Sequence, residues 1–353
     1  MASKTPKIAV IAPLFLRIPP KKQGGTEWVV YHQCNGLVER GYDVTVFAVA
    51  GTKTKAKLVP IMQKPVTEYP VMLSEMESSR RLRLEMTSIG LIGGNLITGN
   101  YDLAFSHARG GETLLPLLHC LRLPVVTILH LPVFTEYAEL MKKFNAPLVS
   151  ISNQQRKRFP RLNYVGTVYN CVDTDIFTFN PKPDDYLLMV TTIGEHKNTL
   201  DGILAAKRAK RRLIIAGKIR DQKYFAEKIK PHIDGKRVVY LGEIGLREKI
   251  QLYRNAAALL FPVIWEEPFG LVMIEAMACG TPVCGYANGA VPEVITNGKT
   301  GYVTARNSTA LSTAIKKIDR IDRAACRREV ERRFSVDKMV DGYEHVIHKI
   351  LHR

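Results

Sequence analysis

The sequence predicts an α/β protein built from two doubly wound, Rossmann-like units, each a parallel sheet covered by helices on both faces. Its 353 residues exceed the roughly 100–200 residues of one typical domain. Short, almost wholly apolar strands alternate with helical segments, which is typical of buried parallel strands. The alternation begins again near Tyr186, after a linker placed at 170–183. We therefore expect domains over residues 1–170 and 180–334 that face each other across a cleft.

The first half carries five segments with the apolar character of buried strands. They are 7–14, 43–50, 103–107, 124–130 and 147–152. A helix is expected from Thr26 to Arg40, where Gly41 ends it, and a second helical stretch from Met72 to Thr98.

The second half repeats the pattern with five more apolar segments. They are 186–193, 213–216, 238–241, 258–264 and 282–286. Since ligands of open parallel sheets bind at the carboxyl ends of the strands, the residues that follow these segments are the candidates for function. The last segment, 335–353, is an amphipathic helix pattern.

Composition argues against a membrane-spanning, disulfide-bonded or zinc-binding protein. No apolar run approaches the roughly 20 residues that span a bilayer. The six cysteines include no Cys-x-x-Cys pair. Residues 1–7 lead directly into the first strand without the apolar region of a signal peptide, so we expect a cytoplasmic protein.

The chain is strongly basic, with 51 Lys and Arg against 33 Asp and Glu and a net charge of +18. Its basic clusters are Arg80 to Arg83, Arg156 to Arg161, Lys207 to Arg212 and Arg320 to Arg333. Such charge indicates either solvated helix faces or an anionic partner, such as a membrane surface, a phosphorylated lipid acceptor or nucleic acid. We expect peripheral contact with an anionic membrane through Arg80 to Arg83. A nucleic-acid-binding module is the weakest alternative, because the sequence lacks a recognition-helix motif or zinc knuckle.

The most informative motif contains Glu267 and Glu275, which are separated by seven residues. A helix that begins near Phe269 would present the amides of residues 269–272 (Phe269, Gly270, Leu271 and Val272) to an anion such as a phosphate. Glu275 would lie about 7.5 Å further along the helix axis, where a carboxylate can accept both hydroxyls of a ribose. Glu267 would stay on the loop before the helix. The pattern predicts a nucleotide-sugar site.

The stretch 261–303, which includes Gly285–Val294 and Asn297–Gly301, resembles the donor site of glycosyltransferase family 4. The similarity extends over nearly the whole chain. It implies the GT-B fold, with the acceptor on the side of the first domain, the donor on the second, and the terminal helix 335–353 packed back on the first. It also implies a retaining glycosyltransferase of the hexosyltransferase type that moves a sugar from a nucleotide-diphosphate sugar to an acceptor hydroxyl. No metal or other cofactor is expected.

The resemblance also assigns roles in the first domain. Gly24 and Gly25 match the family's glycine loop, where backbone amides approach a phosphate or sugar. A lone histidine is more often structural than functional, but His130 matches a strand-end histidine of the family that reaches the donor sugar. His107 is a weaker candidate of the same kind. The pair Asp173 and Asp175 resembles an Asp-x-Asp metal motif, but it lies in the family's inter-domain stretch, so we expect no metal there.

One departure from the family concerns the diphosphate. Family 4 enzymes carry an Arg five residues before a Lys, and both bind the donor diphosphate. Here Lys197 is present, but Thr192 stands at the Arg position and cannot supply a cationic fork. Lys218 and Arg220, just beyond the strand at 213–216, are placed to compensate. We expect Lys197 to be catalytic together with His130 and Glu267; the alternative is a non-transferring relative that binds or hydrolyses nucleotide sugars.

Overall fold

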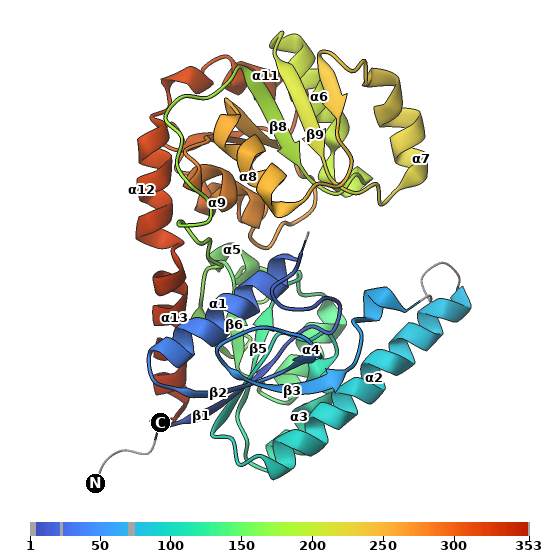
Figure 1. Cartoon of the computed structure of the whole chain (residues 1–353), viewed down its shortest axis with the longest axis vertical. Helices are drawn as coiled ribbons and strands as arrows, with labels where there is room; N and C mark the ends of the chain where they lie inside the picture. The colour runs from blue at the N-terminus through green and yellow to red at the C-terminus, as the bar shows by residue number, and fades with distance from the viewer. Residues whose placement is uncertain (1–4, 22–23, 70–74, 352–353) are drawn as a thin grey trace. The chain divides into compact units, whose positions relative to one another are not determined.

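The computed structural model describes residues 5–21, 24–69 and 75–351, which form two compact units (Figure 1). Unit 1 comprises Met1–Ile151, Arg156–Tyr169 and Val336–Arg353; unit 2 comprises Ser152–Gln155 and Asn170–Ser335. Each unit is one parallel sheet with helices on both faces, which confirms the α/β class and the doubly wound architecture.

Unit 1 contains a seven-stranded sheet in the order β3-β2-β1-β4-β5-β6-β7, with every neighbouring pair parallel. The strands are β1 (Lys7–Ile11), β2 (Asp43–Val49), β3 (Lys57–Met62), β4 (Leu103–Ser106), β5 (Val125–Leu129), β6 (Leu148–Ser150) and β7 (Tyr164–Thr167). Since β4 and β5 are buried on both faces, their sequences are mostly apolar, with Ser106 and Thr127 as buried exceptions. The strand order reverses between β1 and β4, which makes their carboxyl ends the expected ligand position.

The α-helices described wholly within unit 1 are α1 (Gly25–Glu39), α2 (Glu75–Thr98), α3 (Leu115–Cys120), α4 (Thr135–Lys143) and α13 (Val336–Leu351). The last of these packs against α1 and β7. Gly36 makes the contact with α1 close, because a Cβ atom there would collide with Val340. The salt bridge of Arg40 with Asp341, at 2.7 Å, lies at the end of the same contact.

Unit 2 contains a six-stranded parallel sheet in the order β10-β9-β8-β11-β12-β13. Its strands are β8 (Tyr186–Val190), β9 (Arg212–Ala216), β10 (Val238–Tyr240), β11 (Ala258–Phe261), β12 (Val283–Tyr286) and β13 (Gly301–Thr304). Its helices are α6 (Thr199–Arg208), α7 (Gln222–Tyr224), α8 (Leu246–Asn255), α9 (Leu271–Ala278), α10 (Val291–Val294), α11 (Ser308–Ile315) and α12 (Arg323–Arg333). Helix α5 (Asn153–Arg156) begins in unit 2 and ends in unit 1. The strand order reverses between β8 and β11.

The strands differ from the sequence expectation at their ends and in number. The segment 258–264 yields only β11, because Pro262 cannot donate to the ladder. Strands β3, β7 and β13 were not expected: β3 is a partly exposed edge strand that contains Pro60, and the other two are short and contain glycine. Among the described residues, no helix has the length and apolarity required to cross a bilayer.

Candidate functional site

Two of the predicted residues meet where the strand order of unit 2 reverses. Lys197 closes a short 3-10 turn after β8, and Glu267 lies in the loop after β11. The Lys197 Nζ atom lies 2.6 Å from Glu267 Oε2, and both side chains are more than four-fifths buried. The topology therefore brings together two charges that are far apart in the sequence, at the edge where open parallel sheets bind ligands.

Trp265 organises this ion pair. Its indole Nε1 donates to Glu267 Oε2 at 2.8 Å, and Lys197 Nζ lies 4.7 Å from the centre of its ring. His196 packs edge-on against the same indole, with ring centres 5.7 Å apart. Sequence reasoning missed Trp265, although an indole two residues before a candidate carboxylate was a visible signal. The Lys197 ammonium is thus fixed by a carboxylate and by an aromatic face.

The helix of the motif begins at Leu271, two residues later than expected. Phe269 is 1% exposed and packs edge-on against Phe334, with ring centres 5.7 Å apart. Gly270 is the N-cap residue, with a φ of 86° and without a side-chain cap. The amides of Leu271 and Val272 therefore open α9, whereas the Phe269 side chain anchors the loop in the core.

Glu275 is held by α8. Its Oε1 atom lies 2.7 Å from Lys249 Nζ, and its Oε2 atom accepts the hydroxyl of Tyr253 at 2.9 Å. Burial raises the pKa of Tyr253, and the neighbouring Glu275 charge raises it further. Lys249 and Tyr253 were not predicted, although their spacing of four residues on α8 places them on one helix face. Glu275 is therefore oriented before any ligand binds.

The residues around the missing arginine flank an isolated bridge beyond β8 and β9. Ile193 and Ile219 form an isolated parallel bridge, with the Ile193 amide donating to the Lys218 carbonyl at 2.9 Å. Thr192 and Lys218 precede the two bridge residues, and Arg220 follows them, with its amide donating to the Ile193 carbonyl at 3.0 Å. Lys218 and Arg220 are exposed.

Arg220 lies within electrostatic reach of the Lys197 site. Burial lowers the pKa of His196, and the positive charges of Lys197 and Arg220 lower it further. Since His196 packs on Trp265, the Arg220 charge acts on the same group of side chains as Lys197.

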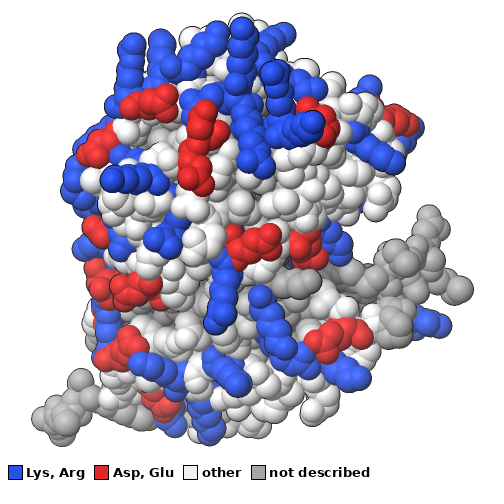
Figure 2. All heavy atoms as spheres, turned by 45° about the horizontal axis from the view of Figure 1, so that its top comes forward, with Lys and Arg blue, Asp and Glu red and all other residues white. Residues whose placement is uncertain are grey.

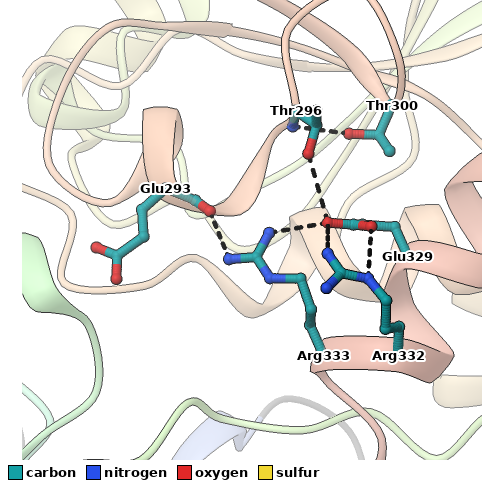
Figure 3. A network of polar contacts seen from close by, with 6 residues as sticks. All are labelled: Glu293, Thr296, Thr300, Glu329, Arg332 and Arg333. Atoms are coloured by element: carbon teal, nitrogen blue, oxygen red, sulfur yellow. Dashed lines mark hydrogen bonds and ion pairs between the residues drawn. The ribbon is translucent and has the colours of Figure 1, made fainter.

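Within the family-like segment 285–294, Glu293 makes structural contacts. The Glu293 carboxylate accepts the amides of Asn153 and Gln154 at 2.8 and 2.9 Å, which caps the start of α5. The Glu293 carbonyl accepts Arg333 Nη2 at 2.8 Å, as Figure 3 shows. The carboxylate thus has a structural role as a helix cap.

A second carboxylate completes this network (Figure 3). Glu329 is 5% exposed, and its Oε1 atom lies 2.8 Å from Arg332 Nη2 and 3.1 Å from Arg333 Nη1. Burial raises the pKa of Glu329, but the two guanidinium groups outweigh that effect and lower it. Arg333 also lies over the Phe334 ring, which in turn packs on Phe269. The network therefore supports the loop that leads into α9.

Three other predicted residues belong to unit 1. Gly24 precedes α1 and Gly25 begins it; a Cβ atom on Gly24 would lie 2.7 Å from Pro20 Cβ, so only glycine fits there. His130, just beyond β5, lies beside His107, just beyond β4, with Nε2 and Nδ1 2.8 Å apart.

The protonation state of the two histidines follows from Gln33. His107 Nε2 lies 2.6 Å from Gln33 Oε1 and must donate to it. A neutral His107 then accepts at Nδ1 from the Nε2–H of His130, which leaves His130 Nδ1 as an unprotonated acceptor. Burial lowers the pKa of His130 to about 4. Burial also lowers the pKa of His107 well below its usual value, and the neighbouring His130 lowers it further. Gln33, missed in the sequence, therefore fixes the tautomer of both rings.

Asp173 forms a local turn. Its Oδ1 atom accepts the amides of Asp175 and Ile176 at 2.9 and 3.3 Å. Within the part of the chain that the structure describes, no three His, Cys, Asp or Glu side chains gather as a metal site requires.

Comparisons with known proteins agree with this geometry. The family model Glycosyltransferase Family 4 matches residues 23–176, and the model Glycosyl transferases group 1 matches residues 173–332. The O-antigen chain mannosyltransferase RfbU of Salmonella typhimurium is 30% identical over 167 residues, which cover 46% of each chain. The N-acetyl-alpha-D-glucosaminyl L-malate synthase of Bacillus anthracis is 32% identical over 127 residues, or 34% of this chain and 32% of that protein. These matches thus span less than half of each relative's length.

Solved structures show the same fold over nearly the full chain. AviGT4, a glycosyltransferase involved in avilamycin A biosynthesis, superposes with a TM-score of 0.74 at 20% identity, covering 98% of each chain. Anabaena Alr3699/HepE, solved in complex with UDP and glucose, superposes with a TM-score of 0.71 at 17% identity, covering 97% of this chain and 99% of that one. The architecture is the two-domain GT-B fold.

Proposed function

Because the chain belongs to the glycosyltransferase family 4-like proteins with the GT-B fold, we propose that it transfers a sugar from a nucleotide-diphosphate sugar to an acceptor hydroxyl. The observation that carries the proposal is the Lys197–Glu267 pair at the ligand-binding edge of unit 2. The same unit supplies the opening amides of α9 and an oriented carboxylate, Glu275.

In this proposal Lys197 binds the donor diphosphate. A lysine ammonium has three N–H donors, so the bond to Glu267 leaves two that can turn toward phosphate oxygens. The amides of Leu271 and Val272 and the guanidinium of Arg220 add further positive potential. Such groups stabilise the charge that develops on the leaving diphosphate, and one donor is typically worth ~10²–10³ in rate.

The proposed reaction proceeds with retention and without a metal. The bond from the anomeric carbon to the diphosphate oxygen breaks while a bond to the acceptor oxygen forms on the same face. The acceptor proton passes to the departing phosphate oxygen, so no side-chain base is required. Lys197 and Arg220 take the charge-neutralising role that a divalent cation has in other transferases. We expect the rate to be the same with and without EDTA.

The relatives suggest which donors to test first. The Anabaena protein was solved in complex with UDP and glucose, and the Salmonella relative is a mannosyltransferase. Release of UDP or GDP from UDP-glucose, UDP-N-acetylglucosamine and GDP-mannose, with and without acceptors, tests the proposal. Lys197→Gln should abolish release, whereas Lys210→Gln, an exposed lysine beyond α6, should leave it unchanged. Equal rates for both variants would contradict the assignment of Lys197.

A second candidate is a relative that binds or hydrolyses nucleotide sugars without transferring them. The observation that favours it is Thr192 at the position of the family's arginine. In that case nucleotide release is the same with and without an acceptor, and free sugar is the product.

The proposal includes peripheral contact with an anionic membrane surface from the cytoplasmic side. On α2, Arg80 and Arg83 are exposed beside Leu82, which is 59% exposed; the side chain of Arg81 lies outside the described residues. Guanidinium groups next to an exposed apolar side chain suit the headgroup region of such a bilayer.

A larger basic surface lies on unit 2. Figure 2 shows Lys and Arg gathered over the part that carries β9, α6 and α11. Its exposed members include Lys207, Arg208, Lys210, Arg212, Arg237, Lys316, Lys317 and Arg320. Co-sedimentation with anionic and neutral vesicles should weaken for Arg80→Glu/Arg83→Glu and persist for Lys207→Glu/Lys210→Glu. The reverse order would move the contact to unit 2, and indifference to lipid charge would refute it.

A further inference from the structure

A pocket of about 360 Å³ opens within unit 1, beside the carboxyl ends of β1, β4 and β5. Its polar lining includes Thr26, Arg109 and Glu112 together with the His107–His130 pair. The rest of its wall is mainly apolar and includes Phe15, Ile128, Leu131, Val133 and Phe134. The volume lies in the usual range for small-molecule sites, roughly 300–1,000 Å³.

The apolar wall continues onto the surface. Phe134 is 56% exposed and Leu131 is 47% exposed, and both line the pocket. Met86 of α2 is 42% exposed and lies next to Gly110, another lining residue. Single exposed apolar residues are common, but a group of them around the mouth of a pocket marks a surface that a ligand covers.

Phe134 lies at the start of α4 and lines the pocket. It occupies the N-cap position of α4 with extended backbone and provides no side-chain cap. Ser, Asp and Asn are strongly preferred at that position because their side chains accept the first free amides. The half-exposed Phe134 ring packs on the Tyr137 ring, with centres 5.7 Å apart, and both rings line the pocket.

The polar lining provides an acceptor for hydroxyl groups. Glu112 Oε1 accepts the Tyr137 hydroxyl at 2.6 Å, and the second carboxylate oxygen of Glu112 can accept another hydroxyl. Burial raises the pKa of Tyr137, and the Glu112 charge raises it further, so this tyrosine stays a donor. The two histidines are neutral at physiological pH. The pocket thus combines the Glu112 carboxylate, the Arg109 guanidinium and two neutral imidazoles with mainly apolar walls.

We propose that this pocket binds a sugar acceptor that carries an apolar ring or a short alkyl chain next to its hydroxyl groups. Glu112 accepts a hydroxyl, and Phe134 and Leu131 cover the apolar part. The assignment of this ligand as the acceptor rests on the proposed function, whereas its binding does not require the donor site.

Direct titration of the full chain, without donor, tests the binding. The probes are phenyl, hexyl and methyl β-D-glucopyranoside. Phenyl and hexyl glucoside should bind at least tenfold more tightly than methyl glucoside. Phe134→Ser should remove most of that preference while leaving the Tm unchanged or higher, because serine can cap α4. Leu140→Ser removes an equally apolar, 42% exposed side chain of the same helix that does not line the pocket, and should change neither affinity nor preference.

Equal affinity for the three glucosides, or an equal loss in Phe134→Ser and Leu140→Ser, would overturn the inference. A long-chain alkyl glucoside in phosphatidylcholine vesicles presents the same chemistry from a lipid phase. Preference for the dissolved phenyl and hexyl probes assigns a soluble acceptor, and a Phe134-dependent preference for the vesicles assigns a lipid-borne one. If none of UDP-glucose, UDP-N-acetylglucosamine and GDP-mannose reacts while the phenyl preference persists, the transfer function is refuted but the pocket assignment stands.

Discussion

Lys197 Nζ and Glu267 Oε2 lie 2.6 Å apart, so the two opposite charges largely balance each other. Because both side chains are buried, the ion pair costs free energy of desolvation unless each charge keeps its partner. The Trp265 indole adds a hydrogen bond to Glu267 and a cation–π contact with Lys197. A diphosphate that arrives near Lys197 would share an ammonium that is already desolvated and oriented. If Lys197 binds the donor diphosphate as proposed, this fixed position is the condition for effective charge stabilisation in a transition state.

The first prediction concerns Glu275 as the ribose acceptor. Glu275→Gln keeps the side-chain volume and an acceptor for Tyr253 but removes the charge that Lys249 balances. Nucleotide affinity should weaken by about 1–3 kcal/mol, the scale of hydrogen bonds to charged groups, as measured by calorimetric titration with UDP. Glu331→Gln, which removes an exposed carboxylate paired with Arg327, should leave affinity unchanged. Equal affinities in both variants would reject the ribose role.

The second prediction concerns the missing arginine. If Arg220 supplies the cation that Thr192 cannot, Arg220→Gln should weaken UDP binding by about 1.5–3 kcal/mol. Thr192→Arg in that background should recover much of the loss, because Thr192 and Arg220 are next to the two residues of the Ile193–Ile219 bridge. Arg212→Gln, at the opposite end of β9, is the matched control. No change in Arg220→Gln would mean that the site binds phosphate without this compensation.

At the scale of elements, α9 depends on a glycine at its start. Gly270 has a φ of +86°, and a Cβ there would lie 2.7 Å from Met273 Cε. Gly298 also has a positive φ, +77°, but a Cβ there would meet nothing within 4 Å. Both positions are therefore strained when substituted, but only Gly270 precedes the proposed phosphate site.

The third prediction uses this pair of glycines. Gly270→Ala and Gly298→Ala should each lower the free energy of unfolding by roughly 1–2 kcal/mol, because alanine disfavours positive φ. Only Gly270→Ala should also weaken UDP binding, since it displaces the first amides of α9. Thermal unfolding together with UDP titration separates the two effects. Comparable UDP affinities in the two alanine variants would show that the start of α9 does not bind phosphate.

The sequence predicts elements better than contacts. The apolar runs at 186–193 and 258–264 located β8 and β11, because strands buried on both faces are continuously hydrophobic. The edge strand β3 was missed because one-sided burial and Pro60 blur that pattern. Candidate positions such as Lys197 followed from the family motif. Trp265, Lys249 and Gln33 could not be placed by sequence alone, since their contacts arise from tertiary packing between separate elements.

At the scale of the molecule, the two units share one construction principle. The strand order reverses between β1 and β4 in unit 1 and between β8 and β11 in unit 2. In each unit the candidate residues follow these two strands. Gly24 and His107 follow β1 and β4, and Lys197 and Glu267 follow β8 and β11. Each unit therefore presents polar groups at the edge where doubly wound sheets bind ligands.

The fourth prediction concerns stability against pH. His130 has a pKa of about 4 in the folded protein and an ordinary value near 6.5 when unfolded, so the unfolded chain binds the extra proton between these values. The contribution of neutral His130 to the free energy of unfolding is fully present above pH 6.5. It declines as the pH falls toward 4, by up to about 1.4 kcal/mol per pH unit. Denaturant unfolding gives the free energy of unfolding of the parent chain and of His130→Asn at each pH. Below pH 6.5, the free energy of unfolding of the parent should fall relative to that of the variant. A pH-independent difference would contradict the neutral pair.

The fifth prediction tests the central claim, retaining transfer from a nucleotide sugar. Proton NMR can follow the full chain with α-configured UDP-glucose, UDP-N-acetylglucosamine or GDP-mannose and a panel of glucosides, recording both nucleotide release and the anomeric signal of the product. We expect one donor to release its nucleotide in step with a new α-linked product, at a rate unaffected by EDTA. A β-linked product would contradict retention, and no acceptor-dependent release from any donor would contradict transfer itself.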